Sequence, residues 1–83
     1  MFEMLRAYVL FHVSSGSEYQ VLRELSSIGS VQEAYVSYDV YDLVVKVKAE
    51  SMEQLKELIT HRLRRINNVR STITLMLADE YES

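Results

Sequence analysis

Apolar residues recur along this chain with two different periods. Residues 6–13, 31–38, 41–48 and 69–78 fit β-strands: the first is apolar at almost every position, and the third alternates apolar with mixed positions. Residues 17–28 and 51–66 have apolar residues at helical spacing, which predicts two helices. The apolar stripes of these helices are Val21, Leu22, Leu25 and Ile28, and Leu55, Leu58, Ile59, Leu63 and Ile66.

An internal repeat relates the two helical segments. The pattern Leu25-x-x-Ile28-x-x-Val31 recurs 38 residues later as Leu63-x-x-Ile66-x-x-Val69, each time where a helix gives way to a strand. Both helices are expected to begin with a Ser-x-x-Gln capping box, formed by Ser17 with Gln20 and by Ser51 with Gln54. Gly29 and the pair Asn67-Asn68 are expected to end them in a left-handed conformation.

The predicted order of elements is β-α-β-β-α-β, with a tight connection at Asp39-Val40 between the two middle strands. Two right-handed βαβ halves joined by a hairpin give an α+β fold, the ferredoxin-like βαββαβ sandwich. We therefore expect one domain over residues 1–83, with a four-stranded antiparallel sheet and both helices on one face. Residues 79–83 form an acidic tail that is expected to fray.

The face of this sheet that the helices leave uncovered is too apolar to lie in water. It should hold Tyr8, Leu10, Val44, Met76 and either Tyr35 or Tyr38. Alternation predicts a polar face there if the protein were a monomer. We therefore predict a symmetric homodimer that buries sheet against sheet, for which about 800 Å² per partner is enough.

Composition narrows the class of protein. The 83 residues include no cysteine, which excludes disulfides and thiolate chemistry, and the net charge of −3 disfavours a nucleic-acid binder. The first residues do not resemble a signal peptide, and no apolar run approaches the length needed to span a membrane. We expect a cytoplasmic protein that does not act on membranes.

The sequence offers little for catalysis, metal or cofactor binding. His12 has no evident orienting acid, and His61, four residues after Glu57, lacks a third metal ligand. The two glycines of the chain cannot build a phosphate-binding fingerprint. We therefore expect no catalytic residues, no metal and no cofactor.

A basic run follows the second helical segment and comprises Arg62, Arg64, Arg65 and Arg70. It could contact nucleic-acid phosphates, but the better interpretation is that it complements the helix dipole and pairs with Glu53 or Glu57. An RNA-recognition motif would share the fold, yet residues 42–48 lack the stacking aromatics that it requires.

The segment from Tyr38 to Asp42 crowds two tyrosines and two carboxylates into a turn. Aspartate is a common turn residue, so a plain hairpin would explain part of this pattern. Asp42, however, enters a strand rich in Val and Leu, where a carboxylate needs a partner. The ammonium group of an amino acid would be such a partner.

These residues carry a family resemblance. Residues 31–47, VQEAYVSYDVYDLVVKV, resemble the pattern V-x-x-a-y-x-v-x-G-x-[YF]-D-L-x-v-x-v, and residues 69–74, VRSTIT, resemble V-x-x-t-x-T. The segments 28–31 and 66–69 are similar to a helix-ending I-P-G-V. All of these patterns are those of the RAM domain, the effector-binding domain of the Lrp/AsnC transcriptional regulators, which this chain therefore resembles. The resemblance covers essentially the whole chain.

This resemblance implies a non-enzymatic module that binds amino-acid effectors and assembles into dimers and then octamers or similar rings. Effectors would bind between dimers near the 38–42 turn. Asp42 and Asp39 would hold an ammonium group, Ser71, Thr72, Thr74 and the turn amides a carboxylate, and Tyr38 and Tyr41 would wall the side chain. Binding would shift the assembly equilibrium.

The chain departs from the family pattern in two respects. The family's helix-turn-helix is missing, so we expect no direct DNA binding but possible co-assembly with full-length Lrp/AsnC regulators. Asp39 stands where the family has glycine, and aspartate tolerates a left-handed backbone better than most residues.

Two other function classes share the fold. An ACT-like regulatory domain acting on a metabolic enzyme would carry a glycine-rich loop after the first strand, which Gly16 matches only thinly. A small ferredoxin-like enzyme would need acid–base residues in a pocket, and His12 and Tyr8 are the only candidates.

Overall fold

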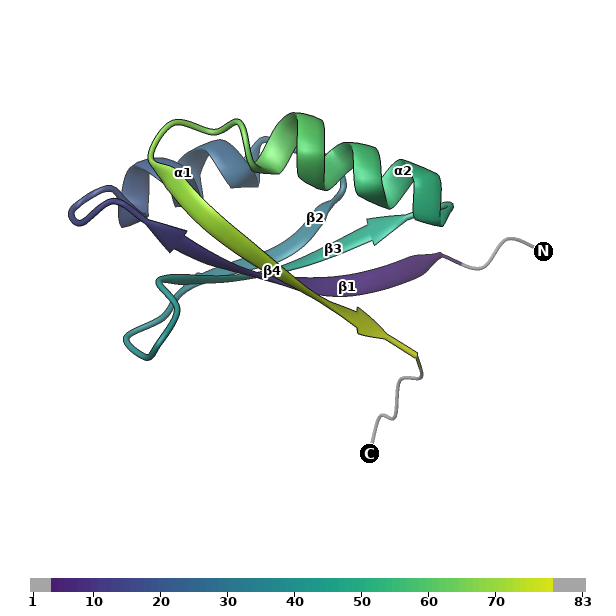
Figure 1. Ribbon diagram of the computed structural model, residues 1–83, viewed down its shortest axis with the longest axis horizontal. Coiled ribbons are helices and arrows are strands. Elements are labelled where there is room, and N and C mark those ends of the chain that lie inside the picture. Colours follow the sequence, from purple (N-terminus) through teal and green to yellow (C-terminus); the bar gives the residue numbers. More distant parts are fainter. Residues whose placement is uncertain (1–3, 79–83) are drawn as a thin grey trace.

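A computed structural model describes residues 4–78, so the predicted acidic tail at 79–83 and the first three residues lie outside the described part. The elements follow the predicted βαββαβ order, with the second helix divided in two (Figure 1). They are β1 (Leu5–Val13), α1 (Glu18–Ser26), β2 (Val31–Val36), β3 (Leu43–Ala49), α2 (Met52–Glu57), η1 (Leu58–Leu63) and β4 (Val69–Leu77).

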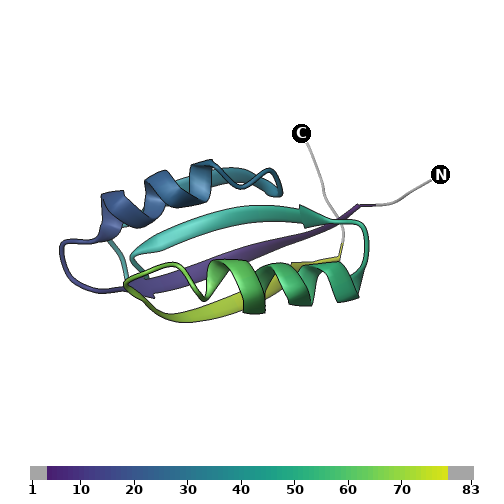
Figure 2. The same ribbon diagram turned by 90° about the horizontal axis from the view of Figure 1, so that it is seen from above.

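The four strands form one antiparallel sheet in the order β2-β3-β1-β4. Figures 1 and 2 show both helices on one side of this sheet, which confirms the ferredoxin-like architecture. The core lies between the two layers, because alternate strand residues point toward the helices. Its fully buried strand residues are Ala7, Val9, Phe11, Leu43, Val45 and Val47, which pack with Val21, Leu25, Leu55 and Leu63 of the helices.

Only the second of the two predicted capping boxes forms. The Ser51 hydroxyl accepts a hydrogen bond from the Gln54 amide over 3.1 Å, and the Gln54 side chain accepts one from the Glu50 amide. At Ser17 the prediction is wrong, because its side chain makes no capping bond. There the Glu18 carboxylate accepts from the Gly16 amide over 2.8 Å, and Gly16 has a left-handed φ of 86°.

The two helix ends also differ from each other. Asn68 adopts a left-handed φ of 75°, as predicted, and its carbonyl accepts a hydrogen bond from the Ser14 amide. Gly29 does not adopt the predicted left-handed conformation. The helix α1 already ends at Ser26, and the Ser27 and Ile28 amides donate to carbonyls three residues earlier. Such bonds tighten the last turn without a left-handed residue.

The second helix widens into a π-helix over η1, closed by a hydrogen bond from the Arg64 amide to the Ile59 carbonyl. The apolar spacing gives a reason. Leu58 and Leu63 would point about 140° apart in an ideal α-helix. The wider turn brings residues five apart onto nearly the same side. Both side chains are buried in the core.

The connection between β2 and β3 is longer than the predicted two-residue turn. Their ladder ends at the pair Val36 and Leu43, and the Ser37 amide donates to the Asp42 carbonyl to close the loop. The Asp42 amide is directed away from β2, because it donates to the Phe11 carbonyl of β1. Asp39, within the loop, has a negative φ and needs no glycine-like conformation.

We call the sheet surface opposite the helices the open face. Partners across the ladders place seven apolar or aromatic side chains there, Tyr8, Leu10, Tyr35, Val44, Ile73, Leu75 and Leu77, together with the charged side chains of Arg6, Lys46 and Lys48. Met76 pairs with Ala7 on the helix side, so the prediction that it lies on the open face is wrong. Tyr38 is outside β2 and 95% exposed, so of the two predicted alternatives Tyr35 is the tyrosine that joins Tyr8 on this face.

The change at Met76 has a local cause in β4. His12 pairs with Ser71 and Val13 with Val69, so Arg70 is an extra residue without a partner on β1. A single extra residue shifts every later side chain of the strand to the other face. Without the extra residue, Met76 would pair with Arg6 on the open face, and Ile73 and Leu75 would lie on the helix side.

Candidate functional site

Part of the predicted effector site gathers in a cavity beside the β2–β3 connection. The cavity has a volume of about 430 Å³ and lies between this loop, the start of α1 and the start of β4. Tyr38, Asp39 and Asp42, three residues of the predicted effector site, line it. Glu18, Tyr19 and Arg70 are among the lining residues that the sequence did not predict. We call this the hairpin cavity.

Asp42 has a partner within the chain. Its Oδ2 atom accepts a hydrogen bond from the Val13 amide over 2.8 Å and lies 3.8 Å from His12 Nδ1. The carboxylate thus fastens the end of β1 to the β2–β3 connection. Because one oxygen is already used, Asp42 offers a ligand its other oxygen and its charge.

The β4 bulge explains how Arg70 comes to line the cavity. Bulged residues often point their side chains differently from the rest of the strand. No ion pair within residues 4–78 uses the guanidinium. The sequence analysis placed Arg70 in the basic run that follows the second helix. The pairing of Val69 with Val13 is what places Arg70 beside the end of β1 and the cavity.

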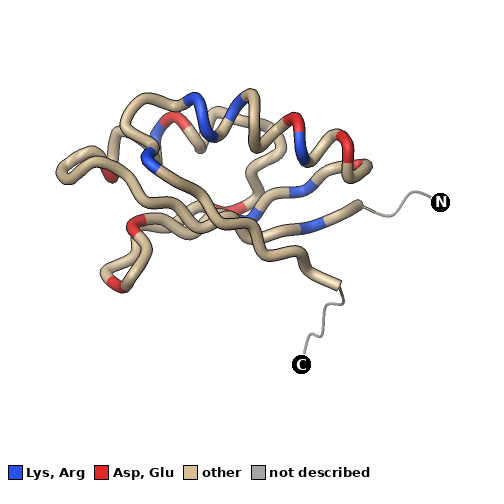
Figure 3. Tube along the Cα trace, viewed as in Figure 1, with Lys and Arg blue, Asp and Glu red and all other residues tan. Residues whose placement is uncertain are grey.

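Acidic groups outnumber basic groups around the hairpin cavity. Glu18, Asp39 and Asp42 contribute three carboxylates and Arg70 one guanidinium, which leaves an excess of two negative charges at neutral pH. Figure 3 shows the two acidic positions of the β2–β3 connection standing away from the basic ones along the second helix. A ligand that carries an ammonium group would balance this field.

The two tyrosines of the loop point in different directions. Tyr38 lies beside Tyr19, and the pKa of Tyr19 is raised, first by hydrogen bonding with Tyr38 and then by its electrostatic interaction with Tyr38. Tyr41 instead packs on His12, with ring centroids 4.6 Å apart, and does not line the cavity. In the single chain, therefore, Tyr38 alone of the two walls the hairpin cavity.

The predicted hydroxyl ligands are not gathered with these residues. Ser71 pairs with His12 on the open face, whereas Thr72 and Thr74 pair with Phe11 and Val9 on the helix face. None of the three lines the hairpin cavity. Arg70 supplies the positive group that the cavity would use for a carboxylate, and the three hydroxyls stay a prediction for a contact between subunits.

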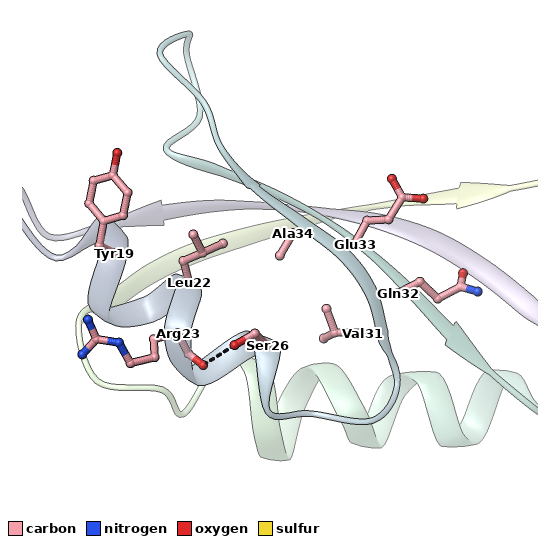
Figure 4. Close-up of a pocket in the computed structure, with 8 residues that line it drawn as sticks. All are labelled: Tyr19, Leu22, Arg23, Ser26, Val31, Gln32, Glu33 and Ala34. Atoms are coloured by element: carbon pink, nitrogen blue, oxygen red, sulfur yellow. Dashed lines mark hydrogen bonds between the residues drawn. The ribbon is translucent and has the colours of Figure 1, made fainter.

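A second cavity, of about 480 Å³, lies between α1 and β2 (Figure 4). Its apolar part is Leu22, Val31 and Ala34, and Figure 4 shows Arg23 and Tyr19 at its α1 side. Although it is larger, its only acid, Glu33, already accepts the Tyr35 hydroxyl over 2.7 Å. We place the candidate site in the hairpin cavity, because three carboxylates and one guanidinium line it, whereas one of each lines the second cavity.

Other site types find no support within residues 4–78. No three or more His, Asp or Glu side chains in that range are placed to hold a metal ion, and none of its helices is long and apolar enough to cross a membrane.

A sheet covered on one face by helices is shared by many functional classes, so the fold and the cavity alone do not define the protein. Comparison with known proteins gives the family. The family model described as Lrp/AsnC ligand binding domain matches residues 6–83. The chain therefore belongs to the Lrp/AsnC family.

Individual relatives are consistent with this family assignment. An uncharacterized HTH-type transcriptional regulator of Pyrococcus abyssi is 30% identical over 60 residues, which are 72% of this chain and 40% of that protein. The chain thus spans well under half of this relative. The crystal structure of FFRP-DM1 is 32% identical with a TM-score of 0.86, and the match covers 89% of this chain and 99% of that one.

A third match comes from a structure with a bound ligand. The complex of the transcriptional regulator NMB0573 of Neisseria meningitidis with L-Met has a TM-score of 0.86 at 10% identity. The match covers 95% of this chain and 53% of that one. At this identity the likeness concerns the fold alone.

Proposed function

We propose that this protein is a non-enzymatic module that binds an amino acid at the hairpin cavity and couples binding to assembly of its subunits in the cytoplasm. The observation that carries the proposal is the meeting of Asp39, Asp42 and Arg70 in one cavity. These are the two kinds of charge that an α-amino acid needs, since carboxylates hold its ammonium group and a guanidinium its carboxylate. The complex of the Neisseria meningitidis relative with L-Met supports this ligand class.

The charge balance favours particular amino acids. A neutral amino acid would satisfy Arg70 and one carboxylate and would leave two of the three cavity acids without a cation. Lysine or arginine would bring a second positive charge toward them. We therefore expect the basic amino acids to bind more tightly than the neutral ones, and the acidic ones least.

The open face supports the assembly half of the proposal. Tyr35, Ile73 and Leu75 are each about half exposed in the single chain, although they are large and apolar. On the same face Lys46 of β3 lies 6.0 Å from the Tyr8 ring centroid, and Glu33 pairs with Lys46 across the ladder. Subunit interfaces typically combine large apolar side chains with polar and charged ones. We propose a homodimer formed through this face, with higher rings built from dimers.

The partner of this module would be a second regulator. Residues 6–83 match the ligand-binding domain of the family, and we propose that they act on transcription through co-assembly with full-length Lrp/AsnC proteins. The ACT-like alternative has no specific observation in its favour, since the family match is to Lrp/AsnC.

Isothermal calorimetry with each of the twenty amino acids tests ligand binding. We expect heat from lysine or arginine, and loss of binding in Asp39→Asn and Arg70→Ala. Asp39→Asn is preferred to a change at Asp42, because Asp42 also fastens β1. Arg64→Ala is the matched control, since Arg64 is equally exposed but lines no part of the hairpin cavity. No heat from any amino acid would refute ligand binding and leave assembly alone.

A further inference from the structure

A groove crosses the outer surface of the helix layer, on the side away from the open face. It has a volume of about 440 Å³ and lies between the end of α1 and the end of η1. Its apolar part is Ile28 and Ile66, and its polar part is Glu24, His61, Arg62 and Arg65. We call this the helix groove. It shares no residue with the hairpin cavity.

The arginines of the helix groove have no acidic partner in the described chain. The expected ion pairs between the basic run and Glu53 or Glu57 do not form, and within residues 4–78 no salt bridge uses Arg62, Arg64 or Arg65. Figure 3 shows basic positions gathered between α2 and β4. Two guanidinium groups against one carboxylate, Glu24, leave the groove positive in a chain whose net charge is −3.

The chain itself contains a segment of matching chemistry. Residues 79–83 read Asp-Glu-Tyr-Glu-Ser, an aromatic residue between carboxylates. Glu80 and Glu82 match the guanidinium groups of Arg62 and Arg65, for which paired carboxylates are the preferred partners. Tyr81 matches the apolar floor of Ile28 and Ile66, and its hydroxyl could stay in water.

We propose that the helix groove binds residues 79–83 of a second copy of this chain. The contact cannot be made within one copy. Asn67, which lines the groove, lies two residues before β4, and the tail begins two residues after β4 ends. β4 is nine residues long, so it separates its two ends by about 26 Å. Residue 81 lies only four residues beyond Leu77 and reaches at most about 14 Å back.

This contact lies apart from the predicted dimer interface. The open face and the helix groove are on opposite sides of the sheet (Figure 1), so a pair of copies joined through their open faces keeps its grooves available. The tail contact would therefore join dimers to one another. It does not depend on amino-acid binding, and failure of either proposal leaves the other untouched.

Photo-crosslinking of the full-length chain tests the contact. The chain has no cysteine, so Ser83→Cys gives one attachment point for a benzophenone probe. The probe-bearing copy is mixed with an unmodified copy that is uniformly labelled with ¹⁵N, and cross-linked peptides are identified by mass spectrometry. We expect light-to-heavy cross-links at Ile28 and within residues 61–67.

Charge reversal decides between specific docking and chance proximity. The double variant Arg62→Glu/Arg65→Glu as acceptor should lose most of these cross-links, and Glu80→Arg/Glu82→Arg in the probe-bearing copy should restore them. Arg64→Glu is the matched control, because it makes the same change on the same turn outside the groove, and it should leave the cross-links in place.

Three outcomes would overturn the proposal. The first is cross-linking that maps elsewhere, for example to the open face. The second is cross-linking to the groove that persists in the Arg62→Glu/Arg65→Glu acceptor. The third is a groove that yields no tail cross-links but protects Arg62 and Arg65 from chemical modification when a short DNA duplex is added, which would assign these cations to a nucleic-acid backbone.

Discussion

At the residue scale, Asp42 has a structural role besides the ligand-binding role that we propose for it. The pattern of a carboxylate entering an apolar strand correctly predicted that Asp42 needs a partner. The structure supplies that partner within the chain, because the Val13 amide donates to it where β1 ends. A residue with a structural bond is a poor position for testing ligand binding, since its loss changes both stability and affinity.

Replacing Asp42 should therefore lower the free energy of unfolding. We expect Asp42→Ala to cost about 1–2 kcal/mol, because a charged acceptor is removed from a partly buried amide. Asp42→Asn should cost less, since its amide oxygen can still accept from Val13. Urea denaturation at fixed protein concentration measures both. Asp39→Ala is the control and should change the midpoint little; an equal loss at Asp39 would contradict this account.

The left-handed backbone at Asn68 gives a second prediction at this scale. Asn68→Ala should destabilise the fold by about 1–2 kcal/mol, because a Cβ other than that of asparagine or aspartate is strained there. Asn68→Gly should cost less, losing mainly the 3.1 Å hydrogen bond from its side chain to Gln20 Oε1. Thermal unfolding compares the two with Asn67→Ala. Equal losses for alanine and glycine at position 68 would rule out backbone strain as the cause.

At the element scale, sequence reasoning identified every strand and both helices, and its errors have local causes. Alternation in β1 and β3 placed Val9, Phe11 and Val45 on the helix side, where they are buried. The single extra residue at Arg70 inverted the rest of β4, so Met76 was assigned to the wrong face and Ile73 and Leu75 were missed. A bulge leaves no periodic signal, because it breaks the period on which the prediction depends.

The same limit applied to the candidate site. Tyr38, Asp39 and Asp42 were found because they are neighbours in sequence and match a family pattern. Glu18, Tyr19 and Arg70 were not, because only the pairing of β1 with β4 and the path of α1 bring them to the cavity. The π-helix was missed for a similar reason, since a helical stripe of Leu and Ile is compatible with both helix types.

The two helix starts provide a matched pair of mutations. Ser51→Ala should cost about 1 kcal/mol, because the hydroxyl that accepts from the Gln54 amide is lost. Ser17→Ala should be close to neutral, because Ser17 makes no side-chain capping bond. Both changes remove one hydroxyl from a Ser-x-x-Gln sequence, and urea denaturation compares them directly. Equal costs would contradict the difference between the two caps.

At the scale of the whole molecule, the chain presents three surfaces with distinct chemistry. The open face is apolar, the hairpin cavity is negative and the helix groove is positive. A domain this small also buries a modest share of its surface alone, so association would add to its stability.

Disruption of the open face should dissociate the dimer. Leu10→Lys places a charge at the centre of this face, and we expect sedimentation velocity at micromolar concentration to change from a dimer or larger species toward the 9.7 kDa monomer. Val40→Lys is the control, because Val40 is 76% exposed in the β2–β3 connection and outside the face. A wild-type chain that already sediments as a monomer would refute the predicted dimer.

The position of β4 at the margin of the sheet has a consequence for quality control in the cell. From Ser71 to Leu77 this strand carries no charge, proline or glycine, the features by which natural proteins usually guard a free strand. An unpaired edge of this kind is a template on which further strands can add, and such growth leads toward cross-β fibres. A dimer formed through the open face would bury side chains of β4 but would leave this backbone edge unpaired, so protection from misfolding requires a separate contact along the edge.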